Sequence, residues 1–340
     1  MKAVVVHAAN DLRIDDVPDP VCGPDDVLVE MEWGGICGSD LAYVKTGLSG
    51  TAQLRDPLIL GHEVGGKVAE VGKNVAGVKV GEPVTIHPAT LVGDHTMPAD
   101  LKERTNLWPE VRYFGSAAFL PHEQGGFSQY RIVRPDQLRP IPDGVTTKEA
   151  ALAEPLGVAI HAVNRAGDVS GKRVLANGCG PVGALVVATL KQRGAKIVYA
   201  ADLSKTALEI AGQMGADELV HLAAGDKLPV GVEISFEASG APQAVGDVLL
   251  ATRRGGTVVQ VGNLPGKETP ISLGQLVTRE INYLGSYRFI DEITDALEML
   301  KDVDVSPLMT HEFDLADAVE AFRVAADRST GSSKVMLKLS

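Results

Sequence analysis

The chain has 340 residues, enough for about two ordinary domains, and 45% of them are hydrophobic, which suits sizeable cores. Its 44 acidic and 32 basic residues give a net charge of −12, which argues against nucleic acid or an anionic membrane as a partner. The apolar run near the start is too short for a signal peptide or a membrane span. Three scattered cysteines, Cys22, Cys37 and Cys179, do not suggest a disulfide framework, so we expect a cytoplasmic protein.

Residues 2–150 read as β-structure. They contain β-branched runs bounded by glycine and proline, and they show no long helical period. We expect strands at Lys2–Val6, Val27–Glu32, Glu63–Val71 and Pro83–His87. This pattern predicts a compact domain that resembles a β-barrel.

Two short segments of this domain carry metal-ligand chemistry. Gly34-Gly35-Ile36-Cys37-Gly38-Ser39-Asp40 supplies a thiolate, and Gly61-His62-Glu63 supplies an imidazole and a carboxylate. Zinc prefers cysteine sulfur and histidine nitrogen, a carboxylate can be the third ligand, and a catalytic zinc keeps one position open. Alone, Cys37 is more simply a small buried side chain and His62-Glu63 an ordinary pair. Together, among glycines that let two segments approach closely, they predict a zinc site.

From about Ala150 the pattern changes to strands that alternate with helices, which is typical of βαβ units in a parallel sheet. We expect strands at Arg173–Ala176, Lys196–Ala201, Val232–Phe236 and Gly256–Val261. We expect the intervening helices at Ala184–Gln192, Lys205–Met214 and Gln243–Arg253. Past Gly285, helices are expected at Asp291–Lys301 and Leu315–Ala326, and a strand at Lys334–Leu339.

The loop after the first of these strands reads Gly178-Cys179-Gly180-Pro181-Val182-Gly183. It follows a strand and opens a helix, and Asp202 ends the next strand 202 − 183 = 19 residues later. This context predicts a dinucleotide site, in which the three glycines allow a tight turn, close approach of the pyrophosphate and helix packing. The helix-start amides hold the phosphate charge. Asp202 would accept the ribose hydroxyls and favour NAD over NADP.

Gly61-His62-Glu63-Val64-Gly65-Gly66, continuing to Gly72 and Val75, resembles the signature of the zinc-containing medium-chain alcohol dehydrogenases. The segment from Gly35 to Asp40 resembles the other half of that metal site. The resemblance extends over essentially the whole chain and points to the polyol and sugar-acid branch. It implies an α/β fold, with a discontinuous GroES-like β-barrel domain at 1–149 and 286–340 and a Rossmann doubly wound parallel sheet at 150–285. It also implies an active site between the domains and a homodimer or homotetramer.

The same resemblance implies roles for further residues. Glu154 is a zinc ligand or a hydrogen-bond partner of zinc-bound water, Ser39 starts a proton relay, and Asp40 orients His62. Zinc lowers the pKa of a secondary alcohol, and the nicotinamide of NAD accepts the hydride. The backbone of Val261-Gly262-Asn263 meets the nicotinamide carboxamide. The substrate and nicotinamide pocket would be lined by Tyr43, Phe114, Tyr287, Arg288 and Phe289.

This sequence departs from many relatives in residues 88–110, which contain no cysteine where those relatives hold a second, structural zinc. We therefore expect one catalytic zinc per chain and no structural zinc. His95 in this stretch is expected to be an ordinary loop histidine.

The implied substrate is a small sugar acid or polyol, with L-idonate first and sorbitol, xylitol or threonine left open. Arg288 or Arg112 could bind a substrate carboxylate, although either could instead pair with the cofactor or with a structural carboxylate. A zinc-free quinone or enoyl reductase would lack Cys37 and His62. A non-catalytic nucleotide-binding protein is the alternative from another class, and an NAD-reduction assay would distinguish it.

Overall fold

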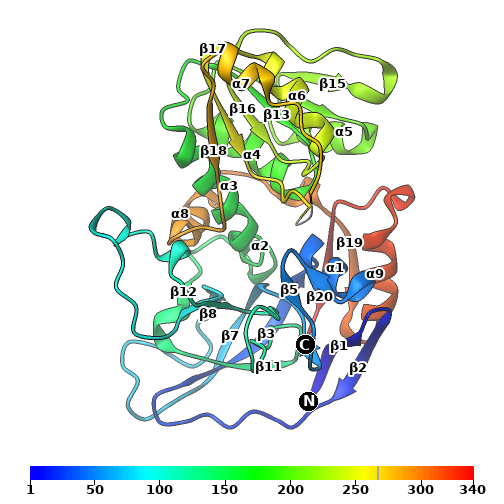
Figure 1. Cartoon of the computed structure of the whole chain (residues 1–340). Coiled ribbons are helices and arrows are strands. Elements are labelled where there is room, and N and C mark those ends of the chain that lie inside the picture. Colours follow the sequence, from blue (N-terminus) through cyan, green and yellow to red (C-terminus); the bar gives the residue numbers. More distant parts are fainter. Residues whose placement is uncertain (266–267) are drawn as a thin grey trace. The chain divides into compact units, whose positions relative to one another are not determined.

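The computed structural model describes residues 1–265 and 268–340 and divides them into two compact units (Figure 1). Unit 1 comprises Met1–Glu154, Ile293–Asp302 and Met309–Ser340, and unit 2 comprises Pro155–Glu292 and Val303–Leu308. The domain boundaries expected from the sequence are 149/150 and 285/286, whereas the boundaries of the compact units lie at 154/155 and 292/293. Val303–Leu308 belongs to unit 2 because its short 3₁₀ turn packs on helix α5 (Lys205–Gln213). Among the described residues, no helix has the length and apolar character needed to cross a membrane.

The main sheet of unit 1 contains strands from both ends of the chain (Figure 1). Its order is β12-β8-β7-β3-β20-β19, and β11 also pairs with β3. The bounds are β3 Val27–Gly35, β7 Glu63–Val71, β8 Pro83–Ile86, β11 Tyr130–Val133, β12 Leu138–Pro140, β19 Met309–Asp314 and β20 Lys334–Lys338. Strand β20 lies antiparallel to β3 and parallel to β19. The C-terminal segment is therefore an internal strand of this sheet.

Shorter strands complete unit 1. One sheet has the order β2-β1-β6, and two strand pairs stand apart from it. These strands are β1 Lys2–Ala8, β2 Asp11–Asp16, β4 Leu48–Ser49, β5 Ala52–Gln53, β6 Leu58–Ile59, β9 Ala89–Leu91 and β10 Val111–Tyr113. Alternate residues of β3 are buried, beginning with Val27, Val29 and Met31, as expected for a strand with one face on the core.

The helices outside the parallel sheet are short, apart from α3. They are α1 Gly38–Thr46, α2 Thr147–Ala150, α3 Ala153–Ala166, α8 Glu292–Met299 and α9 Ala318–Ala326. Single 3₁₀ turns lie at Ala99–Leu101, Thr105–Leu107, Pro135–Gln137, Leu222–Ala224, Ser306–Leu308, Leu315–Asp317 and Arg328–Thr330. The single helix predicted at 315–326 is thus a 3₁₀ turn followed by α9. Helix α1 was not predicted, because nine residues are too few to show a helical period.

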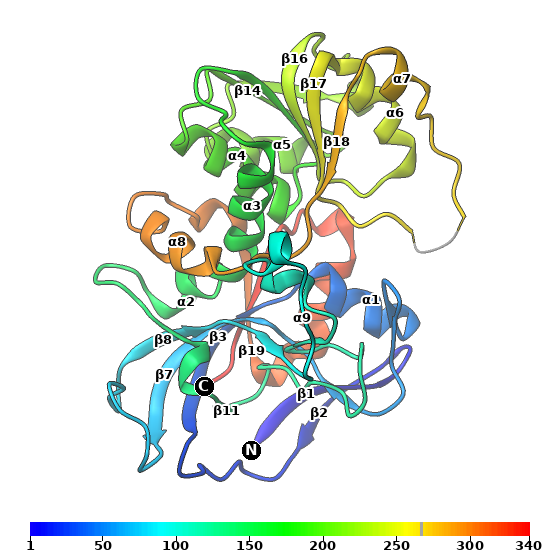
Figure 2. The ribbon, with the colours of Figure 1, turned by 60° about the vertical axis from the view of Figure 1, so that its left-hand side comes forward.

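Unit 2 contains the predicted doubly wound parallel sheet, with strand order β15-β14-β13-β16-β17-β18. Its strands are β13 Arg173–Asn177, β14 Ile197–Asp202, β15 Glu218–His221, β16 Val232–Glu237, β17 Thr252–Gln260 and β18 Asn282–Gly285. Its helices are α4 Pro181–Gln192, α5 Lys205–Gln213, α6 Pro242–Ala251 and α7 Gly274–Thr278. Figure 2 shows α4 and α5 together beside β14, and α6 and α7 near β17 and β18. The strand order reverses at β13, where doubly wound sheets bind ligands.

Two differences from the sequence prediction have local causes. The helix expected to reach Arg253 ends at Ala251, and β17 begins at Thr252. Thr252 is β-branched and extended, and its hydroxyl meets that of Ser235 on the neighbouring strand at 2.7 Å. Strands β15 and β18 were not predicted, because each has only two apolar residues between polar or glycine ends.

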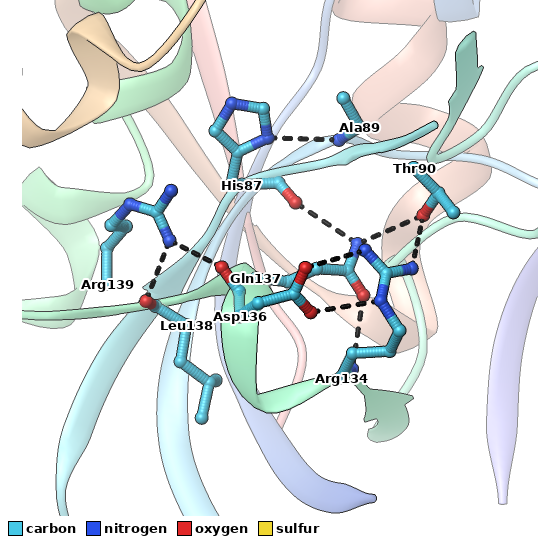
Figure 3. Close-up of polar contacts among 8 residues, drawn as sticks. All are labelled: His87, Ala89, Thr90, Arg134, Asp136, Gln137, Leu138 and Arg139. Carbon is cyan, nitrogen blue, oxygen red and sulfur yellow. Dashed lines mark hydrogen bonds and ion pairs between the residues drawn. The ribbon is translucent and has the colours of Figure 1, made fainter. Parts of the chain in front are cut away.

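The polar stretch at 88–110 is anchored to the rest of unit 1 at its base (Figure 3). Arg134 donates a hydrogen bond to the Thr90 hydroxyl at 2.8 Å, and the Gln137 side chain donates to the His87 carbonyl at 3.2 Å. Farther along, Trp108 donates its indole N–H to the Val92 carbonyl at 2.8 Å, and its ring meets the edge of His95 at 5.6 Å between centroids. Hydrogen bonds and ring packing therefore hold this stretch together.

Candidate functional site

The predicted metal ligands come together at one end of the β3–β7 pair. Cys37 follows β3 as the N-cap of α1, while Glu63 opens β7 and pairs in register with Gly35. The ligand atoms of Cys37, His62 and Glu63 all lie within 4.8 Å of one another. Within the described part of the chain, no other set of three histidine, cysteine or acidic side chains converges in this way.

Asp40 ties the two ligand-bearing segments together through their backbones. One carboxylate oxygen accepts the Cys37 N–H at 2.9 Å and the other accepts the Gly61 N–H at 3.3 Å. The distance from Asp40 Oδ1 to His62 Nδ1 is 3.9 Å, which is too long for a hydrogen bond. The hydrogen bonds of Asp40 hold the backbones of both segments, and its expected role in orienting His62 stays a proposal.

Two glycines leave the room that the cluster needs. Gly61 has φ +94°, and a Cβ there would come within 2.1 Å of the buried Phe127 ring. A Cβ on Gly35 would come within 2.4 Å of the Glu63 carboxylate. Both positions require glycine, the first for its conformation as well as for space.

A buried lysine faces the cluster from β20. The Lys334 ammonium donates to both oxygens of Glu63 at 2.7 and 2.6 Å and to the Ile36 carbonyl at 3.2 Å. Only 2% of Lys334 is exposed. Burial acts to lower the pKa of this ammonium, but the charges of Glu63 and Cys37 outweigh it and raise the pKa. Nothing in the sequence linked Lys334 to Glu63.

Glu154 is also buried beside the cluster. Tyr113 donates its hydroxyl to Glu154 at 2.5 Å, and the Tyr113 ring lies 5.8 Å from that of His62. Burial is the main cause that raises the pKa of Glu154. Tyr113 thus joins two predicted site residues. The sequence did not point to Tyr113, because a tyrosine in a short strand carries no sign of its partner.

The charges of the cluster fit a divalent cation. Burial acts to lower the pKa of His62, but Cys37, Asp40 and Glu154 raise it well above its usual value. This shift indicates an excess of negative charge around the imidazole. A thiolate, an imidazole and a carboxylate form a zinc donor set, so Cys37 and His62 would hold the ion with Glu63 or Glu154 as the third ligand.

The other predicted residues of unit 1 lie near the cluster in sequence or in contacts. Ser39 is half-buried in the first turn of α1, two residues after Cys37. The Tyr43 hydroxyl accepts the Ala117 N–H at 3.0 Å, and only 2% of Tyr43 is exposed. Phe114 is equally buried, with the Arg131 guanidinium 4.9 Å above its ring. The packing contacts of Tyr43 and Phe114 leave their predicted substrate role a proposal.

The glycine loop of unit 2 has the geometry that the fingerprint predicts. Gly178 follows β13 with φ +91°, and Gly180 caps α4, which begins at Pro181 and Val182. A Cβ on Gly183 would lie 1.8 Å from the Gly178 carbonyl oxygen, so only glycine fits there. The intervening thiol of Cys179 is buried, which raises its pKa and suits a space-filling role.

Asp202 ends β14 and connects to the glycine loop. Its carboxylate accepts the Cys179 N–H at 2.6 Å and the Ser204 N–H at 2.7 Å. Asp202 therefore helps to shape the loop, and it also lies where a carboxylate is expected to accept hydrogen bonds from the ribose hydroxyls.

The remaining predicted residues of unit 2 follow β17 and β18. The Val261 and Gly262 N–H groups both donate to the Glu237 carbonyl at 2.8 Å, and Asn263 follows them. Tyr287 is half exposed, and the Arg288 guanidinium lies 5.0 Å from the centre of its ring. Arg288 has φ +49°, which is uncommon for a residue with a side chain. Phe289 is buried.

Arg112 has structural partners. Its guanidinium donates to Glu110 at 2.9 Å and to the carbonyls of Pro121 and Leu120 at 2.7 and 3.2 Å. Of the three possible partners expected for Arg112, namely a substrate carboxylate, the cofactor and a structural carboxylate, the structure has the last.

The sequence and the fold of this chain are similar to those of known dehydrogenases. Residues 23–143 match the model of the alcohol dehydrogenase GroES-like domain, and residues 181–302 match that of the zinc-binding dehydrogenases. The chain is 38% identical to L-idonate 5-dehydrogenase (NAD(P)(+)) of Escherichia coli, over 91% of both chains. It is 36% identical to sorbitol dehydrogenase of Gallus gallus, over 99% of this chain and 96% of that one. The crystal structure of the E. coli L-idonate 5-dehydrogenase superposes with a TM-score of 0.91, covering 99% of this chain and 97% of that one, at 35% identity.

Proposed function

The chain belongs to the zinc-containing medium-chain dehydrogenases, and from that premise we propose that it oxidises L-idonate to 5-ketogluconate with NAD as the hydride acceptor. It is a zinc-dependent NAD(P) dehydrogenase that acts on CH–OH donors, and its substrate class is that of polyols and sugar acids. Its GroES-like and Rossmann parts match the fold class predicted from the sequence. The observation that carries the reaction is the convergence of Cys37, His62 and Glu63 in a chain that also has a dinucleotide loop.

In the proposed reaction, the secondary alcohol gives a hydride from carbon to NAD and a proton from its hydroxyl. Cys37, His62 and either Glu63 or Glu154 would hold a zinc ion, which would supply the Lewis acid for that hydroxyl. Ser39 receives the hydroxyl proton and passes it toward solvent, and Asp40 holds the backbones that carry the ligands.

Unit 2 holds and orients the cofactor in this proposal. Gly178, Gly180 and Gly183 accommodate the pyrophosphate, and the N–H groups at the start of α4, beyond Pro181, hold its charge. Asp202 accepts the ribose hydroxyls. Val261-Gly262-Asn263 meets the carboxamide, and Tyr287 and Arg288 border the nicotinamide.

The choice of L-idonate is supported by the similarity to an L-idonate 5-dehydrogenase and by the suitability of a guanidinium for binding a carboxylate. Arg288 is the proposed reader of the substrate carboxylate, beside Tyr43, Phe114 and Phe289. Sorbitol is the second candidate, because a sorbitol dehydrogenase is almost as similar. Xylitol and threonine remain alternatives of the same machinery. A cytoplasmic location and a homodimer or homotetramer stay predictions.

The substrate test compares specificity constants for idonate and sorbitol in the wild type and in Arg288→Ala. Loss of a charged hydrogen-bonded partner costs on the order of tenfold or more in kcat/KM, and the loss should fall on idonate alone. Arg112→Ala is the control. The Arg112 guanidinium is held by Glu110 and two carbonyls, so its removal should affect both substrates equally. Equal activity on both substrates that Arg288→Ala leaves unchanged would reject the sugar-acid proposal. Absence of NAD reduction with every polyol and sugar acid tried would favour a non-catalytic protein.

The cofactor proposals have separate tests. Metal analysis of the purified protein should find one zinc per chain, and two tightly held ions would contradict the expectation of no structural zinc. NAD should give a higher specificity constant than NADP, and Asp202→Ala should reduce the difference. Asp226→Ala is a matched control. Asp226 follows the next strand, β15, and its carboxylate also accepts a backbone N–H, that of His221 at 2.9 Å. A preference for NADP in the wild type would overturn the assignment.

A further inference from the structure

Unit 2 contains a fully buried carboxylate that forms no ion pair within the described residues. Glu237 is the last residue of β16 and is 0% exposed. One of its oxygens accepts the Ser239 N–H at 2.9 Å and the Ser239 hydroxyl, and the other accepts the Gly240 N–H at 3.2 Å and the Gln260 amide at 2.6 Å. Burial of a carboxylate is costly unless such donors surround it, so its presence calls for an explanation.

The carboxylate lies in a row of polar side chains across four adjacent strands. Asn177, Glu237 and Gln260 are register partners at the ends of β13, β16 and β17. Asn177 donates its amide to Glu237 at 3.5 Å, and Tyr283 of β18 donates its hydroxyl to Gln260 at 2.6 Å. The row therefore runs along the carboxyl edge of the parallel sheet, where such sheets bind ligands.

The carboxylate fixes the loop 238–240, and this loop contacts two segments assigned to the cofactor. A Cβ on Gly178 would lie 2.5 Å from the Ser239 nitrogen, and a Cβ on Gly262 would lie 2.2 Å from the Gly240 nitrogen. Gln260, which donates to Glu237, also donates to the Gly262 carbonyl at 2.7 Å. Movement of the loop would therefore displace both the pyrophosphate turn and the nicotinamide segment.

We propose that Glu237 is a positioning residue of the dinucleotide site, whose carboxylate fixes the loop 238–240 and so the spacing between Gly178 and Gly262. The inference rests on the proposed cofactor role of unit 2, and it assigns Glu237 no contact with the cofactor. An anionic acceptor is needed because both oxygens face N–H donors. A glutamine would place its own NH₂ group against one set of them, and the Gly240 N–H cannot turn away as a side-chain amide can.

The test is calorimetric titration of wild type and Glu237→Gln with NADH, ADP-ribose and AMP. The dissociation constants of NADH and ADP-ribose should rise about tenfold, because both ligands need the Gly178 turn and NADH also needs Gly262. That of AMP, which depends mainly on Asp202, should change less than about threefold. Glu233→Gln is the matched control, because the Glu233 carboxylate lies on the same strand and accepts the Arg173 N–H at 3.0 Å at the opposite edge of the sheet. It should leave all three constants within about twofold.

The outcomes separate a positioning role from a structural one. Unchanged NADH binding by Glu237→Gln would overturn the proposal, and so would a uniform loss for all three ligands that accompanies a lower unfolding temperature. If Glu237→Gln does not fold, Gln260→Met, which removes the donor and keeps the carboxylate, should show the same selective loss to a smaller degree; wild-type-like binding would then reject the proposal. Failure of the wild type itself to bind NADH would instead reject the proposed function.

Discussion

Replacing Lys334 by methionine should strongly destabilise unit 1. The methionine keeps most of the apolar stem and removes the ammonium, which donates to both oxygens of Glu63 and to the Ile36 carbonyl. Glu63 is 1% exposed, so its carboxylate would be left buried without its cation.

The size of the effect follows from the burial. Removing one partner of a buried ion pair costs about 3–5 kcal/mol, because the other charge stays desolvated. With a urea dependence of about 2 kcal/mol per molar, the unfolding midpoint should fall by about 2 M. Lys67→Met is the matched control, because the Lys67–Glu32 pair is as short, 2.6 Å, but lies at the surface. It should cost less than about 1 kcal/mol.

The assay can observe unit 1 alone. The sequence contains two tryptophans, and both Trp33 and Trp108 belong to unit 1. Urea unfolding followed by tryptophan fluorescence therefore reports the unit that contains the pair. A chelator should be present throughout, because zinc binding would stabilise the folded state by itself.

A double variant tests whether the lost stability comes from the charge left on Glu63. If the cost arises from the charge left on Glu63, Glu63→Gln in the Lys334→Met background should restore part of the lost stability. A cost for Lys334→Met no larger than that of Lys67→Met would refute the argument. So would a double variant whose loss equals the sum of the two single losses.

Three further predictions concern conformation, pH and metal. Gly61→Ala should cost about 3 kcal/mol in the same urea assay, because it combines a clash with a positive φ; Gly77→Ala, with φ +80° and open space, gives the cost of the conformation alone. Burial acts to raise the pKa of Glu292, but hydrogen bonds from His161 and a backbone N–H outweigh it and lower the pKa to about 2. The Glu292 carboxylate therefore stabilises the fold above its ordinary pKa of 4.5, and this stabilisation is lost as pH falls toward 2. At pH 7 the wild type should be about 3 kcal/mol more stable than Glu292→Gln, and this difference should shrink across that pH window. A constant difference would contradict the pKa shift. Cys37→Ser should abolish turnover and zinc retention while circular dichroism stays unchanged, and global unfolding of this variant would count against a catalytic rather than a structural metal.

The parts of the site that were predictable from the sequence depend on local chain geometry. Gly178, Gly180 and Gly183 share one turn, and the conformation of that turn is set by the residues within it. Cys37 and His62 lie 25 residues apart, but each has glycines beside it, which indicates two segments built for close approach. The strands that were found are mostly apolar, such as β13, whereas β15 and β18 have only two apolar residues each.

The parts that were missed depend on contacts between distant residues. Lys334 and Glu63 are 271 positions apart, and neither segment carries a mark of the other. Tyr113 meets Glu154 across 41 positions, and the tyrosine is an unremarkable member of a strand until the sheet brings it there. Asp40 was correctly placed near His62, but the choice between binding a ring nitrogen and binding two backbone N–H groups depends on a difference of less than 1 Å.

The position of β20 has a consequence for how the protein is made. Ribosomes synthesise the chain from its N-terminus, so β3 and β7 emerge long before the strand that lies between β3 and β19. During that interval residues Trp33–Gly35 of β3, which pair with β20 in the finished sheet, present unpaired backbone groups, and such groups readily pair with other chains. Unit 2 lies almost entirely between the two halves of this sheet in sequence and can begin to fold while unit 1 waits. The cation that neutralises Glu63 is synthesised 271 positions after it, so this carboxylate has no lysine partner while most of the chain is being made.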